Sequence, residues 1–300
     1  MQRGSGAAIG VDLGGTFVKA GWVNGAGKVV GPIVNRPVDR TGSGEALARA
    51  VARVAAEVRG GRTPKAIGVA IPASVTAPQG RVVRGTSNLK GLEEYPFRAR
   101  VARLTGLPCS VGNDANLAAL GEARSGAARG KRNVLLLTLG TGIGSGLVLN
   151  GALWEGSRGY GAEYGISAIR PPKAAGFGER WMLLEELVSA EAMRNWAGGP
   201  SKDVFRRAAQ GDGRARKAVQ IVYDYLGMTA GNANLLLDLE MVVLGGGMAN
   251  AGPALARGVT AAFRRICPKP YQGKLAIRVA KLADAAGVVG AAIYALEHCR

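Results

Sequence analysis

The stretch that decides the fold reads IGVDLGGT at residues 9–16. Its apolar residues are typical of a buried strand, and Gly14 and Gly15 predict a tight turn whose backbone N–H groups can face phosphate oxygens. Thr16 adds a hydroxyl donor, and Asp12 is suited to hold magnesium through water, since this ion keeps much of its hydration shell. An ordinary hairpin uses glycine in the same way, so this stretch alone predicts a strand, a turn and a candidate phosphate site.

A second glycine turn, GTGIG at residues 140–144, lies between apolar strands predicted at 134–139 and 145–149. Two such hairpins, one in each half of the chain, can clamp the phosphates of a nucleotide from opposite sides, with Thr141 and Gly142 as donors in the second. The repetition predicts two related α/β lobes that face each other across a cleft.

Two more features belong to the candidate nucleotide site. Gly245, Gly246 and Gly247 follow an apolar strand predicted at 241–244. A triple glycine lets a base or ribose lie against the backbone, although a plain strand-to-helix turn explains it equally well. Lys19 lies in the strand after the first turn and faces either phosphate or solvent.

The remaining pattern alternates strands and helices. A turn at Asn24-Gly25 joins strands predicted at 17–23 and 28–35, and helical spacing predicts one helix over 180–196.

A carboxylate has to do any base chemistry in this chain, because its only histidine is His298, next to the last cysteine. The best candidate lies in NDAN at residues 113–116, between a predicted strand and a helix. Asn113 is an ordinary helix N-cap residue. Asp114 beside it can accept a proton from a substrate hydroxyl as phosphoryl transfer begins.

Carboxylates that suit a sugar occur further on, at Glu163 in GAEYG and at Glu185. Carboxylates and amides can accept or donate paired hydrogen bonds with sugar hydroxyls. By composition alone, Glu185 also fits a solvated helix face.

The bulk composition narrows the class of protein. The chain has 300 residues, 47% of them hydrophobic, which suits two α/β domains of ordinary size. The net charge of +18 favours polyanionic partners, but the basic residues are scattered and no zinc-finger or helix-turn-helix pattern accompanies them. We therefore interpret the charge as a basic, solvated surface and do not expect a nucleic-acid partner.

Cysteine usage and hydropathy predict the compartment. Three widely spaced cysteines build no disulfide framework, and no signal peptide precedes the first strand, so we predict a cytoplasmic protein. Residues 133–154 carry no charge and are long enough to span a bilayer, but five glycines interrupt them. That composition fits two strands and a turn, and predicts no membrane segment.

Taken in order, these motifs resemble the ROK family of sugar kinases and related repressors, within the actin/hexokinase/Hsp70 superfamily. The resemblance runs from residue 9 to about 296 and includes a terminal helix predicted at 285–296. It implies a two-lobed, actin-like (ribonuclease H-like) ATPase fold. The first lobe would comprise 1–112 plus 285–300 and the second 113–284, and a homodimer would form through the second lobe.

The resemblance also implies site roles. Asp114 would be the general base that activates the hydroxyl of a hexose or hexose derivative, with ATP as donor and Mg²⁺ as cofactor. The residues implied to bind are, for the sugar, Asn88, Asn113, Glu163 and Glu185; for the ATP phosphates, Gly14, Gly15, Thr16, Thr141 and Gly142; and for adenosine, Gly245, Gly246 and Gly247.

The chain departs from the family pattern at two places. Ile166 stands where the family has a histidine that contacts the sugar and helps to bind zinc, and no cysteine occurs at 171–184 to complete such a site. We therefore predict no zinc site. The sugar, the hydroxyl and the donor stay open, and the alternatives are a non-catalytic sugar-binding regulator and a kinase that uses polyphosphate.

Overall fold

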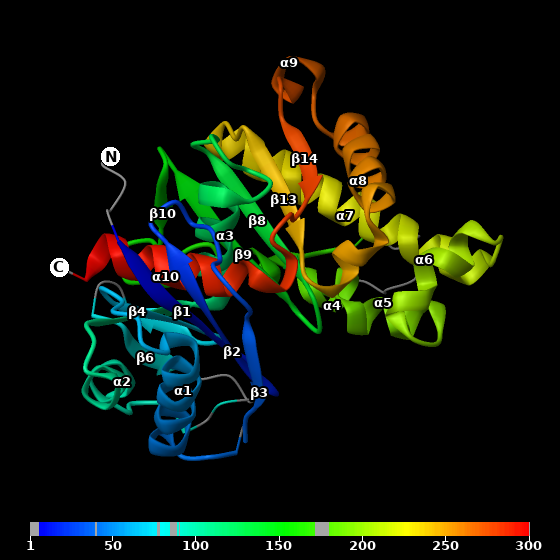
Figure 1. The fold of residues 1–300 in the computed structure, drawn as a ribbon. Coiled ribbons are helices and arrows are strands. Elements are labelled where there is room, and N and C mark those ends of the chain that lie inside the picture. Colours follow the sequence, from blue (N-terminus) through cyan, green and yellow to red (C-terminus); the bar gives the residue numbers. More distant parts are fainter. Residues whose placement is uncertain are drawn as a thin grey trace. The chain divides into compact units, whose positions relative to one another are not determined.

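The computed structural model describes residues 6–39, 41–76, 79–84, 89, 91–171 and 180–299 (Figure 1). Its internal contacts divide the chain into two compact units. Unit 1 comprises Met1–Gly130, Gly146–Ala162 and Leu282–Arg300, and unit 2 comprises Lys131–Ser145 and Glu163–Lys281.

Unit 1 is built on a five-stranded sheet with the order β3-β2-β1-β4-β7. β1 pairs with β2, and β2 with β3, in antiparallel fashion, whereas β1, β4 and β7 run parallel. The strands are β1 (Ala7–Leu13), β2 (Phe17–Asn24), β3 (Val34–Pro37), β4 (Ile67–Ile71) and β7 (Cys109–Asn113), with a separate hairpin of β5 (Ser74–Thr76) and β6 (Arg81–Arg84).

Helices cover both faces of this sheet. Within the described residues they are α1 (Gly44–Arg59), α2 (Phe97–Thr105), α3 (Asp114–Ser125) and α10 (Ala286–His298), the last preceded by the 3₁₀ turn η4 (Ala283–Ala285). Alternate residues of β1 point to opposite sides. Ile9 and Val11 join the core formed with α1 and α2, whereas Ala8 joins the core formed with α3 and α10.

α10 lies directly against the backbone of its neighbours. A Cβ atom at Gly10 would come 1.8 Å from the carbonyl oxygen of Val288, and one at Gly290 would come 1.6 Å from that of Leu117. No side chain fits at either glycine. The glycine at position 10 is therefore required by the contact between β1 and α10.

A buried carboxylate ties α3 to the segment that leads into α10. Glu122 is 0% exposed, and its Oε2 accepts a 2.6 Å hydrogen bond from the backbone N–H of Ala127. Its Oε1 accepts a 2.7 Å hydrogen bond from the backbone N–H of Leu282. Two backbone donors that would otherwise lack partners are thereby satisfied.

The second sheet has the order β10-β9-β8-β13-β14, which repeats the third-second-first-fourth-fifth order of the first sheet. Its strands are β8 (Val134–Leu139), β9 (Ile143–Leu149), β10 (Ala152–Trp154), β13 (Met241–Gly245) and β14 (Ala276–Val279). The smaller elements of the second half are η1 (Tyr164–Ile166), the pair β11 (Ala168–Ile169) and β12 (Met182–Leu183), and η3 (Gly247–Ala251). Its helices are α4 (Leu184–Val188), α5 (Ala190–Ala197), α6 (Ser201–Ala209), α7 (Gly213–Leu237), α8 (Pro253–Ile266) and α9 (Lys269–Gln272).

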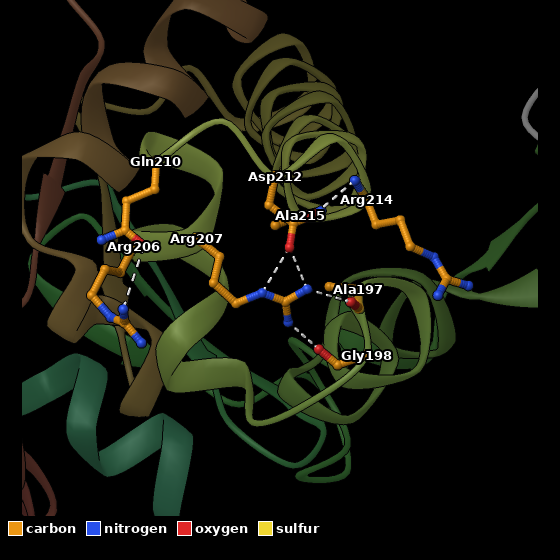
Figure 2. A network of polar contacts seen from close by, with 8 residues as sticks. All are labelled: Ala197, Gly198, Arg206, Arg207, Gln210, Asp212, Arg214 and Ala215. Atoms are coloured by element: carbon orange, nitrogen blue, oxygen red, sulfur yellow. Dashed lines mark hydrogen bonds and ion pairs between the residues drawn. The ribbon is translucent and has the colours of Figure 1, made fainter.

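Arg207 of α6 fastens α5 to α7 (Figure 2). Its guanidinium donates to the backbone carbonyl of Ala197, the last residue of α5, at 3.0 Å and to that of the next residue, Gly198. It also pairs with Asp212, whose other oxygen accepts from the N–H groups of Arg214 and Ala215 and so caps α7. This network fixes the position of α5 within unit 2.

The α/β prediction is confirmed, and most elements lie where the pattern places them. The strand predicted at 28–35 is wrong, since this segment contributes only a bridge between Val23 and Val29 before β3 begins at Val34. The helix predicted over 180–196 is two short helices, because the hydroxyl of Ser189 caps a new helix by accepting from Ala192 N–H.

The compact units differ from the predicted lobes. They place 113–130 and 146–162 in unit 1, together with Leu282 to Asp284. α3 packs on α10, so it joins the unit that α10 completes. The functional division into lobes remains a prediction. Within the described residues, no helix combines the length and the apolar character that a membrane crossing requires.

Candidate functional site

One edge of the unit 1 sheet gathers the candidate residues of the first half. The carboxyl ends of β1, β4 and β7 meet there, since Asp12 is in register with Ala70 and Ile71 with Asn113. Asp12 and Asn113 are thus two strands apart, about 10 Å at the usual strand spacing. The turn after β1 is tight, with Gly14 N–H donating to the carbonyl of Phe17 at 2.9 Å.

Asp12 lies in a small cluster of charged groups. It is the cross-strand partner of Lys19, and Lys19 Nζ lies 3.8 Å from Asp284 Oδ1. Desolvation raises the pKa of Asp12; the charge of Lys19 opposes this rise and that of Asp284 adds to it. Gly287, the second residue of α10, packs against the Asp12 carboxyl, where a Cβ would come 2.9 Å from Cγ.

This donor set fits magnesium better than a metal held only by protein side chains. Within the described residues, no group of three His, Cys, Asp or Glu side chains is arranged to hold a metal. Mg²⁺ is commonly bound by one or two carboxylates plus water and substrate phosphates, and Asp12 and Asp284 can supply the carboxylates. The sequence did not predict a role for Asp284, because no neighbouring residue indicates that it lies close to Lys19.

Asn113 and Asp114 stand where β7 becomes α3. The side-chain oxygen of Asn113 accepts from Asn116 N–H at 3.0 Å, and its amide nitrogen donates to the carbonyl of Ala73 at 3.3 Å. Capping thus accounts for Asn113 structurally, and its contact with a sugar remains a prediction. Asp114, half-buried, begins α3, and its Oδ1 accepts from Ala115 N–H at 2.8 Å.

Asn88, the remaining predicted residue of the first half, lies outside the described residues.

Unit 2 presents two glycine turns side by side. β8 and β13 are parallel neighbours with Gly245 in register with Thr138, so both turns follow the carboxyl ends of adjacent strands. Open α/β sheets bind ligands at such ends. Gly246 has φ +77°, and a Cβ there would lie 2.6 Å from the backbone nitrogen and oxygen of Leu139. Gly246 is therefore needed for its close approach to the end of β8, whereas a Cβ at Gly247 would meet nothing within 4 Å.

Glu185 touches the second glycine turn directly. Its Oε2 accepts from Ile143 N–H at 3.2 Å, and a Cβ at Gly142 would lie 2.5 Å from the same oxygen. The N–H of Ile143 is thus occupied by a carboxylate. The interpretation of Glu185 as a solvated helix face is wrong, because the side chain is half-buried against this turn.

Glu163 lies near Glu185 in unit 2. Desolvation raises the pKa of Glu163 although the side chain retains contact with solvent, and the charge of Glu185 raises it further. The backbone next to Glu163 is held by a hydrogen bond, since the N–H of Tyr164 donates to Ser145 Oγ at 2.8 Å. The structure thereby brings together two carboxylates that the sequence separates.

A cavity of about 480 Å³ opens beside this turn, within unit 2. Thr141, Gly142 and Glu185 border it on one side, and α5 borders it on the other with residues that include Trp196. Ala190 N–H at the start of α5 donates to the carbonyl of Gly140 at 2.8 Å, so α5 and the turn are joined. The part played by α5 could not be predicted, because its apolar spacing is typical of any packed helix.

Comparison with known proteins adds an independent finding. The model of the ROK family matches residues 8–298. The chain belongs to the ROK family. It is 32% identical to a glucokinase of Thermotoga maritima over 305 residues, 95% of each chain.

Solved structures agree with this family. The chain matches a ROK hexokinase of Thermus thermophilus with a TM-score of 0.82 and 32% identity, covering 96% of this chain and 97% of that one. It matches a ROK family glucokinase of Streptomyces griseus, in complex with glucose and AMPPNP, with a TM-score of 0.79 and 27% identity, covering 96% and 98%. The expected two-lobed, actin-like ATPase fold is confirmed by these neighbours.

Ile166, at the position where the resemblance predicts a histidine, is 53% exposed. It lies in η1, just before β11, which pairs with β12. Trp181, beside β12, is 68% exposed. These two apolar side chains are not packed into the core of unit 2. Residues 172–179 lie outside the described part of the chain, and the absence of zinc remains a prediction.

Proposed function

We propose that this protein transfers the γ-phosphate of ATP to a hydroxyl of a hexose or a hexose derivative, with Asp114 as the general base. The observation that carries the proposal is the grouping of predicted residues at the carboxyl ends of the parallel strands in both units. Family membership and the similarity to a glucokinase over 95% of the chain support the reaction class.

Each unit would supply its own groups to the reaction. In unit 1, Gly15 and Thr16 would donate to phosphate oxygens, and Gly14, whose N–H donates to the carbonyl of Phe17, would hold the turn in shape. Asp114 would take the proton of the attacking hydroxyl, and the hydrogen bond from Ala115 N–H would hold its carboxyl at the start of α3. An anionic side chain is stabilised there by the helix dipole.

In unit 2, Thr141, Gly142 and the turn at Gly245–Gly247 would bind the nucleotide. Glu163 and Glu185 would accept hydrogen bonds from sugar hydroxyls. The hydrogen bond from Ile143 N–H to Glu185 would keep the sugar-binding carboxylate in a fixed position relative to the phosphate-binding turn. Preorganisation of this kind is what positions an acceptor hydroxyl for transfer.

Magnesium, when bound, would neutralise phosphate charge and favour the leaving of ADP. Asp12 and Asp284 are the residues that would hold it. Lys19, 3.8 Å from Asp284, would limit the repulsion between their carboxylates while the metal is absent.

The test is a coupled assay for sugar-dependent ADP release across a panel of hexoses and amino sugars. We expect Asp114→Asn to lower kcat by roughly 10²–10⁴-fold, with nucleotide affinity largely kept. Asp203→Asn removes the same charge from an exposed ion pair on α6 and serves as the matched control. Near-normal turnover of the Asp114 variant would show that another group is the base.

Two further outcomes decide between the alternatives. Sugar binding without turnover, with any donor, would favour a non-catalytic regulator. Faster turnover with inorganic polyphosphate than with ATP would favour polyphosphate as the donor, which the net charge of +18 suits.

An exposed apolar surface of unit 2 suggests how the protein associates. Exposed apolar side chains gather at the end of α7 and on α9, where Leu236 is 81% and Tyr271 is 60% exposed. Asn234 joins the two elements by donating to the carbonyl of Tyr271 at 2.7 Å. We expect a cytoplasmic homodimer through unit 2. Leu236→Glu should yield a monomer in light scattering, and an unchanged mass would contradict this surface.

A further inference from the structure

A second cavity, of about 350 Å³, lies within unit 1. It is bordered by α2, by the start of β7 and by the end of α10. Buried Ser110 and Cys109 form part of its lining, and exposed Arg98 and His298 border it on the solvent side. A volume of this size is in the range of small-molecule sites. None of the residues assigned above to the sugar or the nucleotide lines it.

The lining contains a buried polar group that lacks a normal partner. Ser110 is 7% exposed, and its Oγ makes no hydrogen bond of ordinary geometry within the described residues. The thiol of Cys299 lies beside it: burial raises the pKa of this thiol, and the Ser110 hydroxyl lowers it. Cys299 follows the last residue of α10 and lines the cavity together with Ser110. Since an unsatisfied buried hydroxyl is unfavourable, a ligand atom that pairs with it gains affinity.

The fixed charge of the lining is positive. Arg98 forms no ion pair or hydrogen bond within the described residues, and no Asp or Glu lines the cavity there. Burial raises the pKa of Cys109 as well as that of Cys299, so both thiols are neutral near pH 7. The carboxylate next to this region, Glu155, accepts a 3.1 Å hydrogen bond from Tyr294. An unpaired guanidinium at the border of a lining that contains both polar and apolar side chains suits a small molecule with one anionic group.

Two elements lead from this cavity to the candidate catalytic edge of unit 1. β7 begins at Cys109 beside the cavity and ends at Asn113, next to Asp114. α10 ends beside the cavity and begins at Ala286, where Gly287 packs against Asp12. Thirteen helical residues span about 20 Å, so the cavity is remote from Asp12.

We propose that this cavity is a regulatory site for a small molecule carrying one phosphate or carboxylate group, which pairs with Arg98. Occupancy alters the placement of β7 and α10 and thereby the rate of the reaction proposed above. The binding part is independent of that reaction, and only the effect on rate rests on it. Coupling of this kind requires that the ligand favour one arrangement of β7 and α10 over another.

The single histidine of the chain makes binding measurable in isolation. The ring protons of His298 give one set of histidine NMR signals, at the border of the cavity. Inorganic phosphate and, separately, acetate are titrated into the full chain at constant ionic strength. We expect a saturable shift of these signals with at least one of the two anions, and the response to each distinguishes phosphate from carboxylate chemistry.

Matched variants on one helix test the role of Arg98. Arg98→Ala should weaken binding about tenfold or more, as expected for loss of a hydrogen bond to a charged group. Arg103→Ala removes the same charge from α2 outside the lining and should bind within about twofold of the original chain. If Arg98→Ala does not fold, Ala102→Leu fills the cavity while keeping Arg98, and should abolish the shift.

The remaining outcomes overturn the proposal. No saturable shift with either anion, or an equal response of the Arg98 and Arg103 variants, excludes the site. A saturable shift with unchanged kcat and KM excludes regulation while leaving binding established. If no sugar supports turnover at all, the proposed function fails, and the NMR titration still decides whether the cavity binds an anion.

Discussion

Replacing Glu122 by alanine should destabilise unit 1 by about 3–6 kcal/mol. The carboxylate is 0% exposed and accepts hydrogen bonds from the N–H groups of Ala127 at 2.6 Å and Leu282 at 2.7 Å. A hydrogen bond to a charged group contributes about 1.5–3 kcal/mol, and the alanine variant loses both. Glu122→Gln keeps one acceptor oxygen and should lose about half as much. Native domains are stable by only about 5–15 kcal/mol, so the alanine variant should be close to unfolding.

Amide hydrogen exchange reports this effect at the two donors themselves. In Glu122→Gln, one of the N–H groups of Ala127 and Leu282 should exchange at least about tenfold faster, since each 1.4 kcal/mol corresponds to a factor of ten. Urea unfolding gives the total change in stability. Glu57→Gln is the control: it removes the same charge from an exposed ion pair with Arg36 and should cost no more than about 1 kcal/mol. Equal, small changes for the Glu122 and Glu57 variants would refute the argument.

Three other predictions concern single residues. Gly246→Ala should destabilise unit 2 by about 1–3 kcal/mol from its φ of +77° alone, seen as a lower urea midpoint and weaker nucleotide binding; an unchanged midpoint contradicts the strain. Hydrogen bonds from Arg100 and then Tyr95 lower the pKa of Glu45 to about 2, so the Tm advantage of the original chain over Glu45→Gln should be full above about pH 4.5, shrink below it, and be lost as the pH falls through about 2. Because the pKa of Glu163 is raised, this carboxylate takes up a proton at a higher pH than an ordinary glutamate does. On acidification, KM for the sugar should therefore start to rise at that higher pH, and Glu163→Gln should show no such rise.

Sequence reasoning located the turns because their requirements are local. Glycine next to an apolar strand marks a place where the backbone must turn or be approached closely, as at Gly142 and Gly246. Asn113 was predictable as an N-cap for the same reason, since its partner is Asn116 in the first turn of the helix. The family motifs consist of such local requirements, and they sufficed for the fold.

Contacts between distant parts of the chain gave no such signal. Nothing in the sequence joins Glu185 to the N–H of Ile143, or Asp284 to Lys19, because each pair meets only after the sheet and its covering helices have formed. Glu122 is similar: its place in an Ala-rich helix is typical of a solvated position, yet it is fully buried. Glu122 and Glu185 accept hydrogen bonds from backbone N–H groups of distant residues, and the periodicity of a sequence cannot reveal such contacts.

The close packing of α10 against β1 and α3 also constrains how the chain can fold during translation. α10 begins at Ala286, after the ribosome has passed the last residue of unit 2, Lys281. Until then, the face of the first sheet that carries Ala8 and Ala70 has α3 but lacks α10, the second of the two helices that cover it. The unit that starts first is therefore finished last, and its nascent form exposes an apolar surface suited to chaperones for most of translation.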